Sequence, residues 1–124
     1  MSKNRVLIIE DDELLREVYA TKLELEGFAV VTARNGAEGL EKATSSEPDV
    51  ILLDMLMPQM NGLEFLRAYK LPSRHPHVTA LVISNKSSTR EINEAKTMGA
   101  RDYLIKSHHT PAEIVDRIRT YLPD

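Results

Sequence analysis

Short apolar runs and longer amphipathic stretches alternate along this chain. The apolar runs, which we predict to be strands, cover residues 6–9, 28–31, 50–53, 80–83 and 103–105. Three of the runs are continuously apolar over four residues and rich in Val, Ile and Leu, which is typical of strands that are covered on both faces. Because the stretches between the runs are long enough for helical crossovers, the pattern predicts βαβ units and a parallel sheet.

The predicted helices carry recognisable signals at their ends. Thr110, Pro111 and Glu113 fit the N-cap, N1 and N3 positions of the last helix. Ser88 and Glu91 have the spacing of a capping box that opens the fourth helix. These signals place the helix starts shortly after the ends of the predicted strands.

Two stretches carry weaker predictions. In the first predicted helix, Leu14, Val18 and Leu25 fall on one face, and we expect that face to be buried. The stretch over residues 70–77 contains two prolines, and we expect it to be the most irregular connection in the chain.

Composition narrows the class of protein. A chain of 124 residues predicts one domain, which we place at 1–124 with its core over 5–122. The formal net charge of −3 argues against direct nucleic-acid binding, which usually needs a basic face. The chain has no cysteine, and no apolar run approaches the roughly 20 residues that span a bilayer. We therefore expect no membrane partner and a cytoplasmic location.

Acidic residues follow two of the predicted strands. Asp11 and Asp12 come just after the first strand, and Asp54 comes at the end of the third. Ligands of parallel α/β sheets bind beyond the carboxyl ends of the strands, so neighbouring first and third strands would bring the three carboxylates together. Two carboxylates about 4 Å apart repel by roughly 4 kcal/mol at an effective dielectric near 20. A bound Mg²⁺ would offset this repulsion with ligands of the type that it prefers.

A hydroxyl and an ammonium group complete the predicted edge. Ser84 ends the fourth strand and Lys106 ends the fifth. Alone, each of these residues has an ordinary structural role, and an acidic pair before a helix is often an N-cap. Together they supply what a tetrahedral dianion beside a metal requires, and a carboxylate can itself be the nucleophile that forms an aspartyl phosphate.

The chain resembles the receiver domain of two-component response regulators over residues 5–122. The resemblance is carried by "IIEDDELL" at the first strand end, "DVILLDMLMPQMNG" around the third, "VIS" at the fourth and "DYLIK" at the fifth. It implies an α/β fold: a flavodoxin-like (βα)5 three-layer sandwich with a parallel five-stranded sheet in the order 2-1-3-4-5.

The resemblance also implies a role for each site residue. Asp54 would accept the phosphoryl group, and Mg²⁺ would be held by Asp11, Asp12, Asp54 and the backbone carbonyl of Leu56. The other implied roles are a phosphoryl contact for Ser84, an ion pair for Lys106 and a switch movement of Tyr103 together with Ser84.

The same resemblance implies the partners. A sensor histidine kinase or a phosphotransfer protein would donate the phosphoryl group from a phosphohistidine. An output protein or domain would read the switch on the face formed by helix 4, strand 5 and helix 5 of the family's fold, and a phosphorylation-dependent dimer is left open. The protein would not be an enzyme beyond its own phosphorylation and autodephosphorylation.

Two departures from the family pattern keep an alternative open. Asn85 stands where the family usually has a small residue, and Ser107 stands where proline in a cis bond usually follows the lysine. The alternative is a binding module of the same fold that works without phosphorylation. A phosphatase with an aspartyl nucleophile would need a second acid at the position of Leu56, and no glycine-rich nucleotide loop is present.

Overall fold

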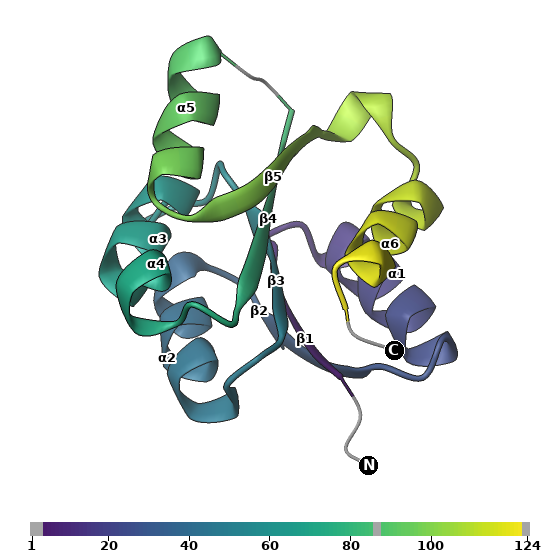
Figure 1. The fold of residues 1–124 in the computed structure, drawn as a ribbon. Helices are drawn as coiled ribbons and strands as arrows, with labels where there is room; N and C mark the ends of the chain where they lie inside the picture. Colours follow the sequence, from purple (N-terminus) through teal and green to yellow (C-terminus); the bar gives the residue numbers. More distant parts are fainter. Residues whose placement is uncertain (1–3, 86–87, 123–124) are drawn as a thin grey trace.

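Five parallel strands form one sheet in the order β2-β1-β3-β4-β5 in this computed structural model, which describes residues 4–85 and 88–122 (Figure 1). The strands are β1 (Arg5–Ile9), β2 (Ala29–Ala33), β3 (Val50–Asp54), β4 (Thr79–Ser84) and β5 (Ala100–Ile105). The helices are α1 (Glu13–Leu25), α2 (Gly36–Ser46), α3 (Gly62–Tyr69), α4 (Leu71–Arg74), α5 (Thr89–Thr97) and α6 (Pro111–Thr120), with a 3₁₀ turn, η1 (Lys106–His108), after β5.

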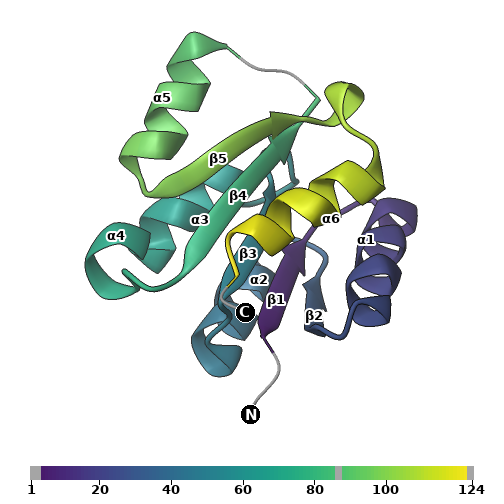
Figure 2. The ribbon, with the colours of Figure 1, turned by 45° about the vertical axis from the view of Figure 1, so that its right-hand side comes forward.

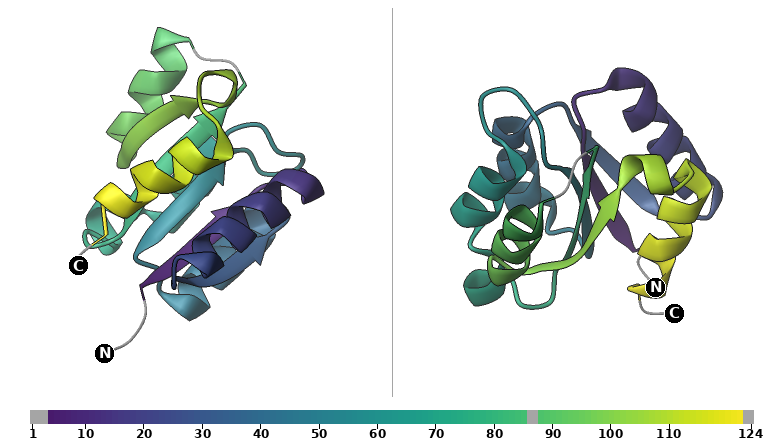
Figure 3. Two further views of the ribbon diagram at one scale, coloured as in Figure 1. Left: turned by 90° about the vertical axis from the view of Figure 1, so that its right-hand side faces the viewer. Right: turned by 90° about the horizontal axis from the view of Figure 1, so that it is seen from above.

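The helices cover the sheet in two layers. Helices α1 and α6 lie on one face, and α2, α3, α4 and α5 lie on the other, as Figures 2 and 3 show from different sides. This is the flavodoxin-like three-layer sandwich that the sequence predicted, with the predicted strand order. None of the helices in the described part of the chain is long and apolar enough to cross a bilayer.

The central strands are buried on both faces, as their continuous apolar runs predicted. Successive residues of β1 point to opposite faces of the sheet because the side-chain period of a strand is two. Leu7 and Ile9 pack in the core under α2 and α3, whereas Val6 and Ile8 pack in the core under α1 and α6. All four side chains are fully buried.

The buried face of α1 differs from the sequence prediction. Leu14 and Leu25 are 70% and 82% exposed, while Tyr19 and Leu23 face the core. This helix carries apolar residues on two sides, so periodicity alone does not decide which side meets the sheet. The expected buried face over Leu14, Val18 and Leu25 is therefore wrong.

The connection over residues 70–77 is more regular than predicted. Lys70 has a left-handed backbone (φ 57°) that ends α3, and α4 begins at the next residue. A proline is tolerated in the first turn of a helix, where its missing N–H breaks no helical hydrogen bond. The short helix can therefore form in spite of the two prolines.

Candidate functional site

The strand register brings the predicted site residues to one edge of the sheet. β1 pairs with β3, β3 with β4, and β4 with β5, so that their carboxyl ends lie together. Glu10 and Lys106 directly follow β1 and β5, and Asp54 and Ser84 are the last residues of β3 and β4. We refer to this edge as the acidic rim.

Three carboxylates converge on the acidic rim. Glu10, Asp11 and Asp54 each place an oxygen within 4.8 Å of the others, and among the described residues they are the one such group of three or more metal-ligating side chains. Glu10 and Asp54 are buried, whereas Asp11 is exposed. An all-oxygen, carboxylate-rich set of this kind suits a hard divalent cation such as Mg²⁺.

Asp12 has a different place from the one expected. Its side chain caps α1 by accepting a hydrogen bond from the backbone N–H of Leu15 at 3.0 Å. Its own backbone N–H donates to Oε2 of Glu10 at 3.1 Å. The structure therefore brings together Asp11 and Asp54 with Glu10, which the sequence analysis did not assign, and leaves Asp12 outside the cluster.

A signal for this arrangement was present in the sequence. Asp is among the most favoured N-cap residues, and Glu13 after it is a favourable first-turn residue. Assigning Asp12 to the cap would have moved the pair of site acids back by one residue to Glu10 and Asp11. The position at which β1 ends decides between the two assignments.

Lys106 lies between two of these acids. Its Nζ is 2.8 Å from Oε1 of Glu10 and 3.4 Å from Oδ2 of Asp54. Burial by itself lowers the pKa of Lys106, but hydrogen bonds and charges from Glu10 and Asp54 outweigh burial and raise that pKa above its ordinary value. The described residues contain no cis peptide bond, so Lys106 reaches the rim without the cis-proline geometry of the family.

Asp54 is in an environment that disfavours its charge. Burial, hydrogen bonding to Glu10 and the Glu10 charge raise the pKa of Asp54 to about 8, and Lys106 offsets this only in part. The backbone N–H of Leu56 donates to Oδ1 of Asp54 at 3.4 Å, and the Leu56 side chain is exposed. One ammonium group therefore does not balance the buried acids of the rim. The expected metal contact of the Leu56 carbonyl stays a prediction.

Ser84 and Tyr103 lie in contact beside the rim. Ser84 is fully buried, and Tyr103 is partly buried against the core under α3 and α5. Burial raises the pKa of Tyr103, and a side-chain hydrogen bond with Ser84 lowers it, so the hydroxyl groups of the two residues interact. Asn85, the next residue along the chain, is exposed. The predicted switch pair is therefore assembled, and its movement stays a prediction.

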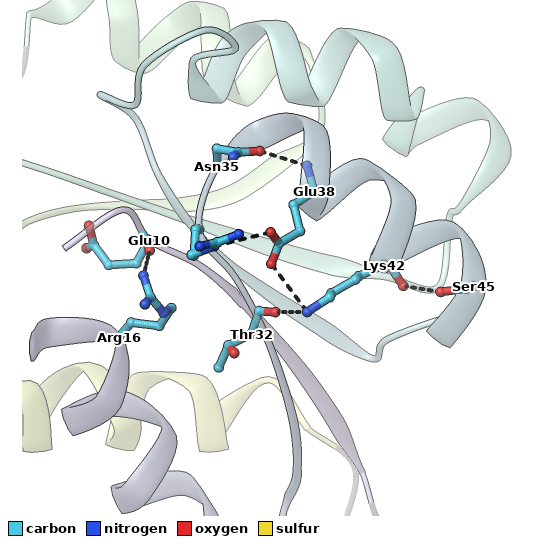
Figure 4. A network of polar contacts seen from close by, with 8 residues as sticks. Glu10, Arg16, Thr32, Asn35, Glu38, Lys42 and Ser45 are labelled. Atoms are coloured by element: carbon cyan, nitrogen blue, oxygen red, sulfur yellow. Dashed lines mark hydrogen bonds and ion pairs between the residues drawn. The ribbon is translucent and has the colours of Figure 1, made fainter. Parts of the chain in front are cut away.

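Polar contacts also fix the backbone around β1 and β2. The Arg16 guanidinium donates to the backbone carbonyl of Glu10 at 2.9 Å (Figure 4). On the other face of the sheet, Lys42 of α2 donates to the carbonyl of Thr32 at 2.6 Å and forms an ion pair with Glu38. The Arg16 contact fixes the backbone of Glu10, whose side chain faces Lys106, and the Lys42 contact attaches α2 to the edge strand β2.

This fold and rim define a receiver-type α/β protein, in which acids, a hydroxyl and an ammonium group meet at the carboxyl ends of a five-stranded parallel sheet. The chain belongs to the response regulator receiver domain family, whose family model matches residues 6–119.

Named relatives agree with this assignment. The chain is 37% identical over 122 residues to the transcriptional regulatory protein PrrA of Mycobacterium leprae, covering 98% of this chain and 51% of PrrA. It is 32% identical over 117 residues to the protein named "Probable transcriptional regulatory protein TcrX" of Mycobacterium tuberculosis, covering 94% of this chain and 49% of TcrX. The chain therefore spans about half the length of these relatives.

The fold is also similar to that of a solved structure. The chemotaxis protein CheY4 of Vibrio cholerae superposes with a TM-score of 0.88 at 30% identity, covering 98% of this chain and 100% of that chain. A relative with nearly the same length as this chain thus shares its whole architecture.

Proposed function

We propose that this receiver domain accepts a phosphoryl group on Asp54 and uses it to switch the binding of an output partner. One observation carries the proposal: the buried Asp54 carboxylate lies 3.4 Å from the Lys106 ammonium within a cluster of three carboxylates. A nucleophilic carboxylate, a metal-type acid pair and a cation at one rim are the parts that phosphoryl transfer to aspartate requires.

The residues of the rim fit a magnesium ion. Glu10, Asp11 and Asp54 would hold it, with the Leu56 carbonyl as a further candidate ligand. The raised pKa of Asp54 supports the fit, because it marks negative charge that Lys106 leaves uncompensated. When bound, Mg²⁺ would neutralise charge on the transferring group.

The remaining steps belong to side chains of this chain. An oxygen of Asp54 attacks the phosphorus atom of the donor, forming the P–O bond as the P–N bond to the donor histidine breaks and its electron pair returns to the imidazole ring. Lys106 pairs with an oxygen of the transferred group, and Ser84 donates a hydrogen bond to another. The protein thus catalyses only its own phosphorylation and autodephosphorylation.

The switch would act through the face of α5, β5 and α6, which are helix 4, strand 5 and helix 5 of the family's fold. New charge-assisted bonds to Ser84 and Lys106 would contribute about 1.5–3 kcal/mol each. Moving a two-state equilibrium from 1:99 to 99:1 takes about 5.5 kcal/mol, so two such bonds bias a switch strongly. The contact of Ser84 with Tyr103 supports a path from the rim to β5.

The partners follow from this chemistry. The donor would be a phosphohistidine on a sensor histidine kinase or phosphotransfer protein in the cytoplasm. The output would be a separate protein or a further domain, consistent with relatives named as transcriptional regulators, and a phosphorylated dimer would be one form of output.

The test combines Mg²⁺ with acetyl phosphate and reads the intact mass of the protein. We expect a gain of one phosphoryl group that is absent without Mg²⁺ and absent in Asp54→Asn. NMR shifts with and without the phosphate mimic beryllofluoride should spread from the rim to Tyr103 and α5. No mass gain in the wild type would overturn the proposal in favour of a module that works without phosphorylation.

A further inference from the structure

A cavity lies far from the acidic rim, between α2 and the α3–α4 segment. Its volume is about 540 Å³, and it is lined by Leu40 and Thr44 of α2 and by Ala68, Tyr69 and Lys70 at the end of α3. The helices that follow β2 and β3 run back along the sheet, so their last turns lie at the amino ends of the strands (Figures 1 and 2). The cavity is therefore separate from the rim around Asp54.

Two cationic side chains, Lys70 and Arg74, line this cavity together with His75, and none of the described residues that line it is acidic. Lys70 and Arg74 are four residues apart along one helical turn, where the backbone N–H of Arg74 donates to the carbonyl of Lys70. Like charges at this spacing repel each other. Within residues 4–85 and 88–122, none of the salt bridges involves Lys70, Arg74 or His75.

The wall of the cavity is apolar and aromatic. The Tyr69 and His75 rings stack at 3.9 Å with an interplanar angle of 2°, and Tyr69 also stacks on Phe65. The Tyr69 hydroxyl is buried and has no hydrogen-bond partner among the described residues. Burial raises its pKa, and the Glu47 charge adds to this effect. The wall is therefore preorganised by stacking and retains one unused polar group.

We propose that this cavity binds a small organic anion. The anionic group, a carboxylate or a phosphate, pairs with Lys70 and Arg74, and the flat apolar body of the ligand packs on Leu40 and Ala68. The volume falls within the range of about 300–1,000 Å³ that small-molecule sites usually have. Charge complementarity selects an anion, and the apolar wall selects an organic ion over an inorganic one.

The test is a titration of the full chain followed by backbone amide NMR at constant ionic strength. The probes are benzoate, adenosine monophosphate and inorganic phosphate. We expect saturable shifts of the Thr44, Ala68 and His75 amides with benzoate or adenosine monophosphate, with a Kd of about 1 mM or tighter. The absence of saturation at these amides with both organic probes, each added up to about 10 mM, would overturn the proposal.

Matched variants separate this site from nonspecific attraction. Arg74→Gln removes an exposed charge of the cavity. Lys70→Asn removes the other charge, and asparagine is chosen because it tolerates the left-handed backbone at that position. We expect each to weaken binding about three- to tenfold. Arg67→Gln, an exposed cation of α3 outside the cavity lining, should leave binding unchanged.

Two further outcomes would also overturn the proposal. One is an equal loss of affinity in Arg67→Gln and Arg74→Gln, which would indicate attraction to net charge alone. The other is a Kd for inorganic phosphate as low as those for both organic probes. That result would show that the apolar wall plays no part in binding. Thermal melts confirm that each variant is folded before it is titrated.

Discussion

Oε1 of Glu10 lies 2.8 Å from Nζ of Lys106, closer than the 3.4 Å that separates Lys106 from Asp54. Glu10 is fully buried, so its charge must be balanced within the rim. The residue just after β1 is thus both a partner of Lys106 and a member of the three-carboxylate cluster.

Glu10→Gln should slow the phosphorylation of Asp54, whereas Asp12→Asn should not. The first substitution removes a charge beside Lys106 and a carboxylate of the proposed Mg²⁺ site, and we expect phosphorylation of Asp54 by acetyl phosphate to slow by about tenfold or more. The second keeps the helix cap, because asparagine caps a helix as well as aspartate does. The rates, measured by intact mass over time at fixed Mg²⁺, would contradict this reading if Asp12→Asn were the slower variant.

Asp54→Asn should stabilise the metal-free protein at pH 8. The folded pKa of Asp54 is about 8, above its value in the unfolded chain. Between roughly pH 4 and 8 the folded state therefore holds a proton that the unfolded state has released, and stability falls as the pH rises through this window. Asparagine avoids this loss, and we expect the Tm at pH 8 in EDTA to rise by about 5 °C or more.

Two conditions serve as controls for the Asp54 variant. At pH 5 the Tm difference between the two proteins should be smaller than at pH 8, because the wild type has then lost only the part of its stability that falls between about pH 4 and 5. Mg²⁺ should raise the Tm of the wild type more than that of Asp54→Asn, because the Mg²⁺ site that we propose for the folded state includes this carboxylate. A lower Tm for Asp54→Asn at pH 8 in EDTA would refute the raised pKa.

Asp102→Asn should destabilise the protein in a pH-dependent way. Oδ2 of Asp102 accepts from Arg117 at 2.6 Å and from the Tyr121 hydroxyl at 3.0 Å, joining β5 to α6. Burial alone raises the pKa of Asp102, but the hydrogen bonds from Tyr121 and Arg117 outweigh it, so the folded pKa is lowered. The stabilisation is present above the unfolded pKa of about 3.9 and is lost as the pH falls through the folded pKa.

Urea unfolding at two pH values measures this effect. At pH 7 we expect Asp102→Asn to cost about 1 kcal/mol, and at pH 3 we expect a smaller difference from the wild type. Asp116→Asn, on the exposed side of α6, is the matched control and should change the free energy of unfolding by less than about 0.5 kcal/mol. An equal cost of Asp102→Asn at both pH values would show that its ionisation does not matter.

Tyr69→Phe should be neutral or slightly stabilising. The buried hydroxyl of Tyr69 has no partner among the described residues, so its removal deletes a buried polar group and breaks no hydrogen bond. Tyr121→Phe is the matched comparison, because its hydroxyl donates to Asp102 at 3.0 Å, and we expect it to cost about 1 kcal/mol. Unfolding in urea compares the two, and a comparable loss in Tyr69→Phe would mean that its hydroxyl has a partner.

Much of the fold could be predicted from local pattern. The apolar runs of β1, β3 and β4 are fully buried, and the cap formed by Thr110 and Glu113 opens α6 as its sequence indicates. These features depend on side-chain polarity and on hydrogen bonds within a few residues, so they can be read from neighbouring positions. The strand order was available only through the family resemblance.

The sequence alone does not decide between neighbouring residues that carry similar local signals. Three consecutive acids follow β1, and only the level at which β1 ends against β3 decides that Glu10 and Asp11 face Asp54 while Asp12 caps α1. In the same way, α1 has two apolar sides, and packing on the sheet buries Tyr19 while Leu14 stays exposed.

The sequence by itself determined the kind of chemistry: acids, a hydroxyl and an amine at the ends of buried parallel strands. Tertiary structure decided which acids share the site and where a basic cavity forms between Thr44 and Lys70. The physical reason is how far apart in the chain the interacting residues lie. Polarity and helix capping act between near neighbours in the chain, whereas the meeting of charges depends on register and packing between distant segments.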